Sequence, residues 1–209
     1  MIYLSDDYVD KYCNTLSYLI GRSYQEKYTF DYIEKRISHS LLVGELEQSN
    51  ITLIAFSSME KIYSDIFPTN DNNYNLDIYG VFGWIGYAYM HLFLSLNITF
   101  ESLFNVISIE EMMDLYHLYH EMDINQLIDH AKEIMKYSLL DVVMKRKKIS
   151  SKDLGEKTKI SISTITALRY GKRDIGKLEI NKALTIANAL NIKITSLLTN
   201  IQLEKSMAF

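Results

Sequence analysis

Apolar side chains recur every three or four residues along much of this chain, which is the spacing of one face of an α-helix. The first such run follows Ser5, a predicted N-cap, and contains Tyr8, Val9, Tyr12, Leu16, Leu19 and Ile20. A second run follows Thr29 and contains Phe30, Ile33, Ile37 and Leu41. The short apolar run 51–56 fits either a strand or a helical turn, because its periodicity does not decide between them.

Polar residues indicate where further helices begin. Ser57-x-x-Glu60 and Ser108-x-x-Glu111 are predicted capping boxes, and Asp123 is a predicted cap of a helix that leads toward residue 137. Residues 68–77 form the only obvious loop of any length. With one proline and eight glycines in 209 residues, the chain is predicted to be globular and mainly α-helical.

Residues 150–173 predict two short helices joined by a tight turn. Ser150 and Ser161 each precede one of these helices and are predicted N-caps. Gly171 closes the second helix. The side chains predicted to hold the pair against a small core are Leu154, Ile160, Ile165 and Leu168. A helix–turn–helix of this kind presents its second helix to the major groove of DNA.

From about Ser138 to Thr199 the chain resembles the Xre/Cro-type, lambda-repressor-like DNA-binding domains. The matching pattern runs S-x-x-x-L-G-x-x-x-x-I-S from residue 150, then S-T-I-x-x-L-x-x-G-K-R from residue 163, then A-x-A-L-N-I from residue 187. The resemblance implies a lambda-repressor-like five-helix DNA-binding domain at residues 137–200. A mostly helical acidic domain at 1–136 would precede it, and a short tail at 201–209 would follow.

The resemblance also implies which residues meet DNA. The predicted base-reading residues are Ile162, Ser163, Thr166 and Ala167. The predicted phosphate contacts are Ser151, Ser161, Arg169, Tyr170, Lys172 and Arg173. Because the base-reading set lacks the Arg, Gln and Asn side chains that make bidentate base contacts, we expect DNA shape and phosphate contacts to supply more of the discrimination.

One position departs from the family pattern. The family usually has Glu two residues before the glycine, paired with an Arg on the first helix, whereas this chain has Arg169 there and Met144 at the partner position. Both ends of the usual ion pair are therefore expected to be missing. Two interpretations follow: a neutral packing replacement, or an Arg169 freed to contact the DNA backbone.

Charge divides the chain into a basic and an acidic part. Residues 137–200 carry 13 Lys and Arg against 5 Asp and Glu, whereas residues 1–136 carry 8 against 20. Although the net charge of the whole chain is −4, residues 137–200 therefore form a basic module, as expected for binding DNA phosphates.

The acidic part has no Lys or Arg between Lys61 and Lys132. The acids proposed there as a partner-binding surface are Glu110, Glu111, Asp114, Glu121 and Asp123. They form either an ordinary solvated face or a docking surface for a basic protein such as a toxin. The acidic domain is alternatively expected to fold back on the basic module or to form a homodimer.

The segment 78–100 contains no charged residue and is long enough to span a bilayer. It contains polar residues such as His91 and Asn97, so a buried helix and no membrane association are expected. Cys13 is the single cysteine, which excludes an internal disulfide, and it is expected to pack in the core rather than react. With no signal-peptide pattern at the N-terminus, the predicted location is cytoplasmic.

No catalytic chemistry is indicated. His117-x-x-His120-Glu121 places two imidazoles on one helical face, but no known metal spacing accompanies them, so no metal site or cofactor is predicted. No phosphate-cradling glycine loop or nucleophile motif occurs, and the chain is predicted not to be an enzyme.

The sequence therefore predicts a DNA-binding transcriptional regulator, an autorepressor of antitoxin or phage-regulator type that binds double-stranded DNA as a homodimer. Its N-terminal domain would dimerise or bind a partner protein. The alternative is a toxin-neutralising or anti-defence protein inhibitor that acts mainly through the acidic N-terminal domain.

Overall fold

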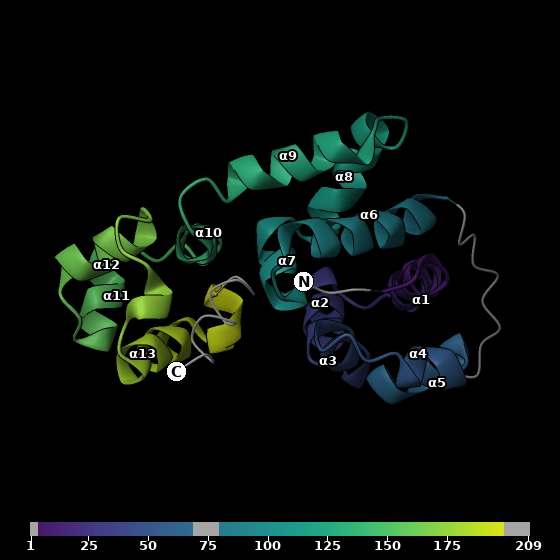
Figure 1. The fold of residues 1–209 in the computed structure, drawn as a ribbon, viewed down its shortest axis with the longest axis horizontal. Coiled ribbons are helices and arrows are strands. Elements are labelled where there is room, and N and C mark those ends of the chain that lie inside the picture. Colours follow the sequence, from purple (N-terminus) through teal and green to yellow (C-terminus); the bar gives the residue numbers. More distant parts are fainter. Residues whose placement is uncertain (1–3, 69–79, 199–209) are drawn as a thin grey trace. The chain divides into compact units, whose positions relative to one another are not determined.

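The structure, a computed structural model, describes residues 4–68 and 80–198, and these residues are mainly helical (Figure 1). No strand occurs among them. The predicted mainly α fold is therefore confirmed. The run 51–56, which the sequence left open between strand and helix, forms the helix α4 (Thr52–Phe56).

Contacts group the helices into two units, Met1–Leu96 with Ile107–Ile128, and Asn97–Val106 with Asp129–Phe209. The helices of the first unit are α1 (Asp6–Gln25), α2 (Phe30–Ser38), α3 (Leu41–Glu47), α4, α5 (Met59–Ile66), α6 (Val81–Leu96), α8 (Ile109–Tyr119) and the start of α9 (Ile124–Ile134). The second unit contains the rest of α9 with α7 (Phe100–Val106), α10 (Leu139–Arg146), α11 (Ser151–Thr158), α12 (Ile162–Arg169), α13 (Ile180–Leu190) and the 3-10 helices η1 (Ile175–Lys177) and η2 (Ile194–Leu197).

These units do not follow the predicted boundary at residue 137. Residues 97–106 and 129–136 belong to the second unit by their contacts, although the sequence assigned them to the acidic domain. The domains at 1–136 and 137–200 stay a prediction.

Helix starts follow the predicted caps with one exception. The Thr29 side chain accepts a hydrogen bond from the Tyr32 N–H at 3.3 Å, and Ser108 forms the predicted capping box with Glu111. The capping box predicted at Ser57 is wrong: Ser58 is the N-cap of α5 and Ser57 ends α4. Because two adjacent serines can each cap a helix, the predicted start of α5 differs from the observed one by one residue.

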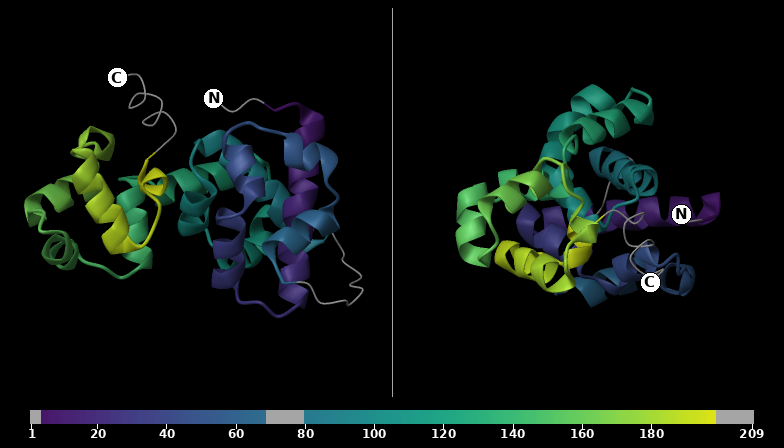
Figure 2. Two further views of the ribbon diagram at one scale, coloured as in Figure 1. Left: turned by 90° about the horizontal axis from the view of Figure 1, so that it is seen from below. Right: turned by 60° about the vertical axis from the view of Figure 1, so that its left-hand side comes forward.

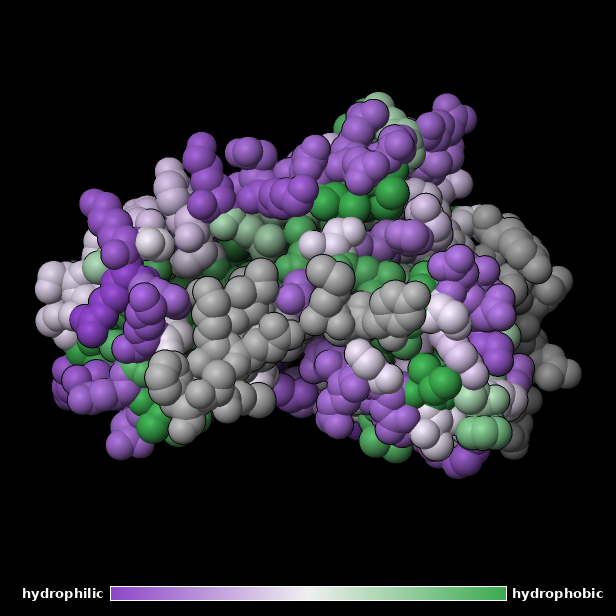
Figure 3. All heavy atoms as spheres, viewed as in Figure 1, coloured by the Kyte–Doolittle hydropathy of each residue, from purple (hydrophilic) through white to green (hydrophobic). Residues whose placement is uncertain are grey.

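Helix α9 is amphipathic and begins after Asp123 as predicted, with the Asp123 carboxylate accepting the Asn125 N–H at 2.8 Å. Its apolar residues Leu127, Ile128 and Ala131 are buried. Figure 3 shows hydrophilic side chains over the part of the chain that α9 occupies in Figure 1.

The first unit is built on α1 and α6, which contact each other more extensively than any other two helices in the described part of the chain. The predicted apolar face of α1 is buried at Tyr12, Leu16, Leu19 and Ile20. Seven of the sixteen residues of α6 are buried and only Tyr87 and Ser95 are exposed, so the uncharged segment forms a largely covered helix; its residues 78 and 79 lie outside the described part. No described helix is by itself long and apolar enough to cross a membrane; α6 and α7 pass that test only as a pair, across the break at residues 97–99.

Gly86 allows α1 and α6 to approach closely. A Cβ at this position would lie 2.7 Å from the Ser17 backbone nitrogen and closer still to the Cys13 carbonyl oxygen. The Ser17 hydroxyl donates to that carbonyl at 2.7 Å. Cys13 is buried there, and burial, with a smaller effect of the Asp10 charge, raises the pKa of its thiol to about 12. The thiol is therefore protonated at neutral pH and poorly reactive, as its predicted core position implies.

We expect Gly86→Ala to lower the free energy of unfolding by about 1–3 kcal/mol, because the added methyl forces the two helices apart. Gly44→Ala is the matched control: a Cβ at Gly44 meets nothing within 4 Å. That substitution is expected to be neutral or to stabilise by about 0.5–1 kcal/mol, since alanine is the better helix former. Urea unfolding of both variants tests the difference, and equal midpoints would contradict it.

In the second unit, α7 packs against α10 and η2, although the sequence separates it from them by the whole of α8 and α9. The Glu101 carboxylate accepts a hydrogen bond from the Lys193 N–H at 3.0 Å and another from the Ser196 hydroxyl. The buried Ser102 hydroxyl donates to the Ser196 carbonyl oxygen at 2.8 Å. These contacts satisfy polar groups at the start of η2, so α7 is a structural part of this unit.

We expect Glu101→Ala to lower the free energy of unfolding by about 1–3 kcal/mol, because two donors of η2 lose their acceptor. Hydrogen exchange at residues 193–197 should accelerate accordingly. Glu110→Ala removes an exposed acid from the first turn of α8 and should change stability by less than about 0.5 kcal/mol. Unchanged exchange in η2 after Glu101→Ala would exclude this role of α7.

Candidate nucleic-acid interface

The helix pair predicted from residues 150–173 is present as α11 and α12. Ser150 forms a capping box with Asp153, and the hydrogen bonds that Ser150 donates hold the pKa of the Asp153 carboxyl below its usual value. Lys159 turns the chain in a left-handed conformation with φ of 60°. The Ser161 side chain then accepts from the Thr164 N–H at 3.3 Å and begins α12. Both predicted N-caps are confirmed.

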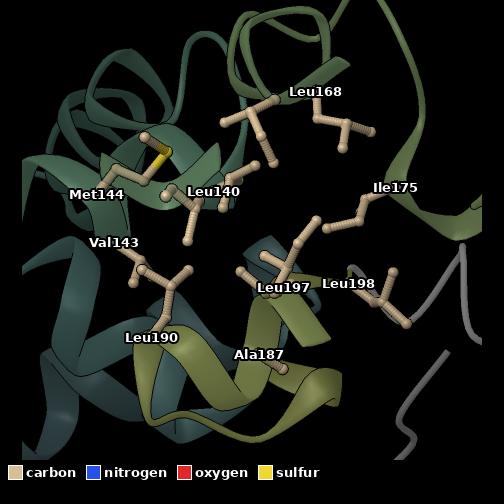
Figure 4. Packing of buried hydrophobic residues seen from close by; sticks show 12 residues of the cluster. Leu140, Val143, Met144, Leu168, Ile175, Ala187, Leu190, Leu197 and Leu198 are labelled. Atoms are coloured by element: carbon tan, nitrogen blue, oxygen red, sulfur yellow. The ribbon is translucent and has the colours of Figure 1, made fainter. Parts of the chain in front are cut away.

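A small apolar core holds this pair. Of the four predicted core residues, Leu154, Ile165 and Leu168 are buried, and Ile160 is partly buried against them. Figure 4 shows Leu140 and Val143 of α10 with Leu190 of α13 in the same interior, together with the residues around η1 and η2. In both views of Figure 2 the green to yellow helices α11 to α13 lie together as one group.

Gly155 lies where a Cβ would be crowded, and Gly171 lies where a Cβ would clash. A Cβ at Gly155 would lie 3.1 Å from the Ile160 carbonyl oxygen, inside the turn between α11 and α12. Gly171 has φ of +67°, and a Cβ there would lie 2.7 Å from the Tyr137 carbonyl oxygen. Gly171 therefore ends α12 as predicted, and the two residues that follow it, Lys172 and Arg173, are exposed.

All four predicted base-reading residues lie on α12. Ile162 is 50 % exposed although it is apolar, Ser163 is exposed, and Thr166 and Ala167 are half-buried. The Ser163 hydroxyl lies 3.1 Å from the Ser161 hydroxyl, within a small group of hydroxyls at the start of the helix. This part of α12 presents small side chains and one isoleucine, so a DNA backbone or base edge can approach it closely.

The predicted phosphate-contacting residues lie around α12. Ser161, Tyr170, Lys172 and Arg173 are exposed, and Ser151 is half-buried in the first turn of α11. The Tyr170 ring packs edge-on against Tyr137, with ring centroids 5.4 Å apart. Contact of these residues with DNA stays a prediction.

The contacts of the Arg169 side chain agree with neither interpretation drawn from the sequence. Its Nε donates to Asp141 Oδ1 at 2.7 Å, and the Asp141 side chain is only 1 % exposed. Lys145 Nζ lies 2.7 Å from the other carboxylate oxygen at ion-pair distance, without hydrogen-bond alignment. The two residues of the usual ion pair are absent, as expected, but an ion pair between α10 and α12 is nevertheless present: its acid, Asp141, lies on α10 and its base, Arg169, on α12.

Asp141 is the residue that sequence reasoning missed. The family's basic partner lies at the position of Met144, whereas the acid that pairs with Arg169 lies three residues earlier on the same helix. The signal was the combination of Asp141 within the apolar run of α10 and a basic residue at 169. Because the Asp141 carboxylate already holds Arg169 Nε, we no longer count Arg169 among the proposed phosphate contacts.

We expect Arg169→Met to lower the free energy of unfolding by about 3 kcal/mol, because it leaves the buried Asp141 carboxylate without its main partner. Arg173→Met, which changes an exposed arginine of the following loop, should cost less than about 0.5 kcal/mol. In a double-mutant cycle with Asp141→Asn, Arg169 and Asp141 should show a coupling of about 1–3 kcal/mol. Additive effects in urea unfolding would show that the two side chains do not interact.

The acids proposed for partner binding lie in the first unit, on α8 and in the turn that follows it. Glu110, Glu111, Asp114, Glu121 and Asp123 are all exposed, and Glu111 takes part in the α8 capping box. His120 Nδ1 lies 2.8 Å from the Tyr116 carbonyl oxygen. Within residues 4–68 and 80–198, no three His, Cys, Asp or Glu side chains are grouped so that they could hold a metal ion.

Comparison with known proteins identifies the same region. Residues 139–202 match a family model described as the Cro/C1-type HTH DNA-binding domain, which confirms the resemblance to the Xre/Cro family. No curated protein and no solved structure matches the chain. The part of the chain that contains α10 to η2 is therefore a Cro/C1-type helix-turn-helix DNA-binding domain.

Proposed function

We propose that this protein is a transcriptional regulator of autorepressor type that binds double-stranded DNA through α12. The observation that carries the proposal is the exposed first turn of α12, with Lys172 and Arg173 beyond its end, inside a region that matches Cro/C1-type domains. In such domains the reading helix lies in the major groove, and positive residues around it contact phosphates.

The side chains of α12 are better suited to apolar contacts and single hydrogen bonds with bases than to bidentate ones. Ile162 and Ala167 offer apolar contact with thymine methyl groups, and Ser163 and Thr166 offer single hydrogen bonds. None of the four makes a bidentate contact with a base. Phosphate contacts and DNA shape would then supply much of the affinity, so binding would depend steeply on salt.

The proposal also includes dimerisation and a cytoplasmic location. A homodimer would match a palindromic operator next to the protein's own gene, because the two-fold symmetry of the protein and of the site agree. The single buried cysteine is compatible with a reducing compartment. A role as an antitoxin would add a basic partner protein, for which the exposed acids around α8 offer complementary charge.

We expect the full chain to bind its own promoter more tightly than a scrambled duplex, with a log–log salt slope that falls by about 0.9 in Lys172→Ala as one phosphate contact is lost. Ser163→Ala combined with Thr166→Ala should lower the preference for the promoter several-fold and leave the salt slope unchanged. Fluorescence anisotropy at several salt concentrations measures both quantities.

Lys11→Ala is the control, because it removes an exposed lysine from α1 in the other unit. Its affinity and slope should equal those of the unchanged protein. Equal slopes for Lys172→Ala and Lys11→Ala would show that α12 and its following loop do not face DNA. Failure to bind any duplex would favour the alternative function, a protein inhibitor that acts through the acidic domain.

A further inference from the structure

A cavity of about 450 Å³ lies within the first unit, between the end of α2 and the helices α3, α4 and α5. Its size falls in the range of about 300–1,000 Å³ that is typical of small-molecule sites. None of the residues considered for DNA or partner binding lines it.

The wall of this cavity is apolar. Leu42, Ile62 and Ile66 contribute buried side chains, and Leu53 is partly exposed. Leu41 is 69 % exposed although it begins α3 beside this wall. A single exposed leucine needs no explanation, but one that continues the apolar lining of a cavity extends the surface on which an apolar ligand can rest.

The rim of the cavity is basic, although the surrounding part of the chain is acidic. Lys35 and Arg36 lie in the last turn of α2, and His39 follows as its C-cap. The one acid in the lining is Asp65, and Lys61 Nζ lies 2.5 Å from its Oδ1, which balances its charge. Lys35 and Arg36 therefore leave the rim with an excess of positive charge.

Part of the rim is held in place by hydrogen bonds. Arg36 Nε donates to the Ile66 carbonyl oxygen at 2.6 Å, which ties α2 to the end of α5. His39 Nδ1 lies 2.9 Å from the Lys35 carbonyl oxygen. The Ser38 hydroxyl lies 3.1 Å from the same nitrogen, so two contacts hold the His39 ring at the end of α2. The Arg36 guanidinium is thus held beside the apolar wall before any ligand binds, and the Lys35 ammonium belongs to the exposed rim next to it.

We propose that this cavity binds a small amphipathic carboxylate. The apolar chain or ring of the ligand lies against Leu41, Leu53 and Ile62, and its carboxylate lies beside Lys35 and Arg36. Apolar walls supply the affinity of such a site, and a few fixed polar groups orient the ligand. The proposal is independent of DNA binding, since no residue of α10 to η2 takes part.

Isothermal titration calorimetry of the full chain with decanoate, decanol and acetate separates the two parts of the site. We expect saturable binding of decanoate, about tenfold weaker binding of decanol, which lacks the charge, and no binding of acetate, which lacks the apolar chain. Lys35→Ala should weaken decanoate about tenfold and leave decanol unchanged. Leu53→Ser should weaken both ligands by a similar factor.

Lys11→Ala serves as the matched control and should leave all affinities unchanged. Far-ultraviolet circular dichroism and the urea midpoint establish that the variants are folded, and the exposed position of Lys35 favours this outcome. Equal affinities for decanoate and decanol, or decanoate binding that neither Lys35→Ala nor Leu53→Ser changes, would overturn the proposal. So would the absence of saturable binding by any of the three ligands.

Discussion

The eight-residue helices α10, α11 and α12 depend on the apolar core that they share, because helices of this length are not stable alone in water. Helices α11 and α12 contribute few buried side chains, whereas α10 is buried along most of its length. The caps at Ser150 and Ser161 and the turn at Gly171 determine where each helix begins and ends. The core then sets how α12 is held, and the exposed face of α12 follows from which of its residues the core uses.

The Asp141–Arg169 ion pair makes the arrangement of α10 and α12 around this core more specific. Apolar contacts tolerate small rotations of a helix, whereas a buried carboxylate and a guanidinium nitrogen 2.7 Å apart favour one arrangement of α10 and α12. The pair also shows that an ion pair between the same two helices can form with its charges exchanged and with one partner at a different position, 141 instead of 144. Binding by α12 would then rely on small side chains and the loop after it, since its one arginine is occupied inside the protein.

Local features of the fold could be predicted from the sequence, and features that join distant residues could not. Caps at Thr29, Ser108 and Ser150 and the glycine at 171 follow from chemistry within a few residues, and the structure confirms them. The start of α5 was missed by one residue because Ser57 and Ser58 are equally good caps. The contacts of Asp141 with Arg169, of α7 with η2 and of Arg36 with Ile66 join residues far apart in the chain, which periodicity and composition do not connect.

The place of α7 in the second unit has a consequence for synthesis on the ribosome. Ser102 is made 94 residues before Ser196, the residue to which it donates its hydrogen bond. At a rate of about 5–20 residues per second, roughly 5 to 20 s pass between the two. During this interval α7 has left the ribosome without η2 and much of the surface it will finally cover, and its apolar side chains are a target for chaperones. The unit to which α7 belongs is complete only after η2 has emerged.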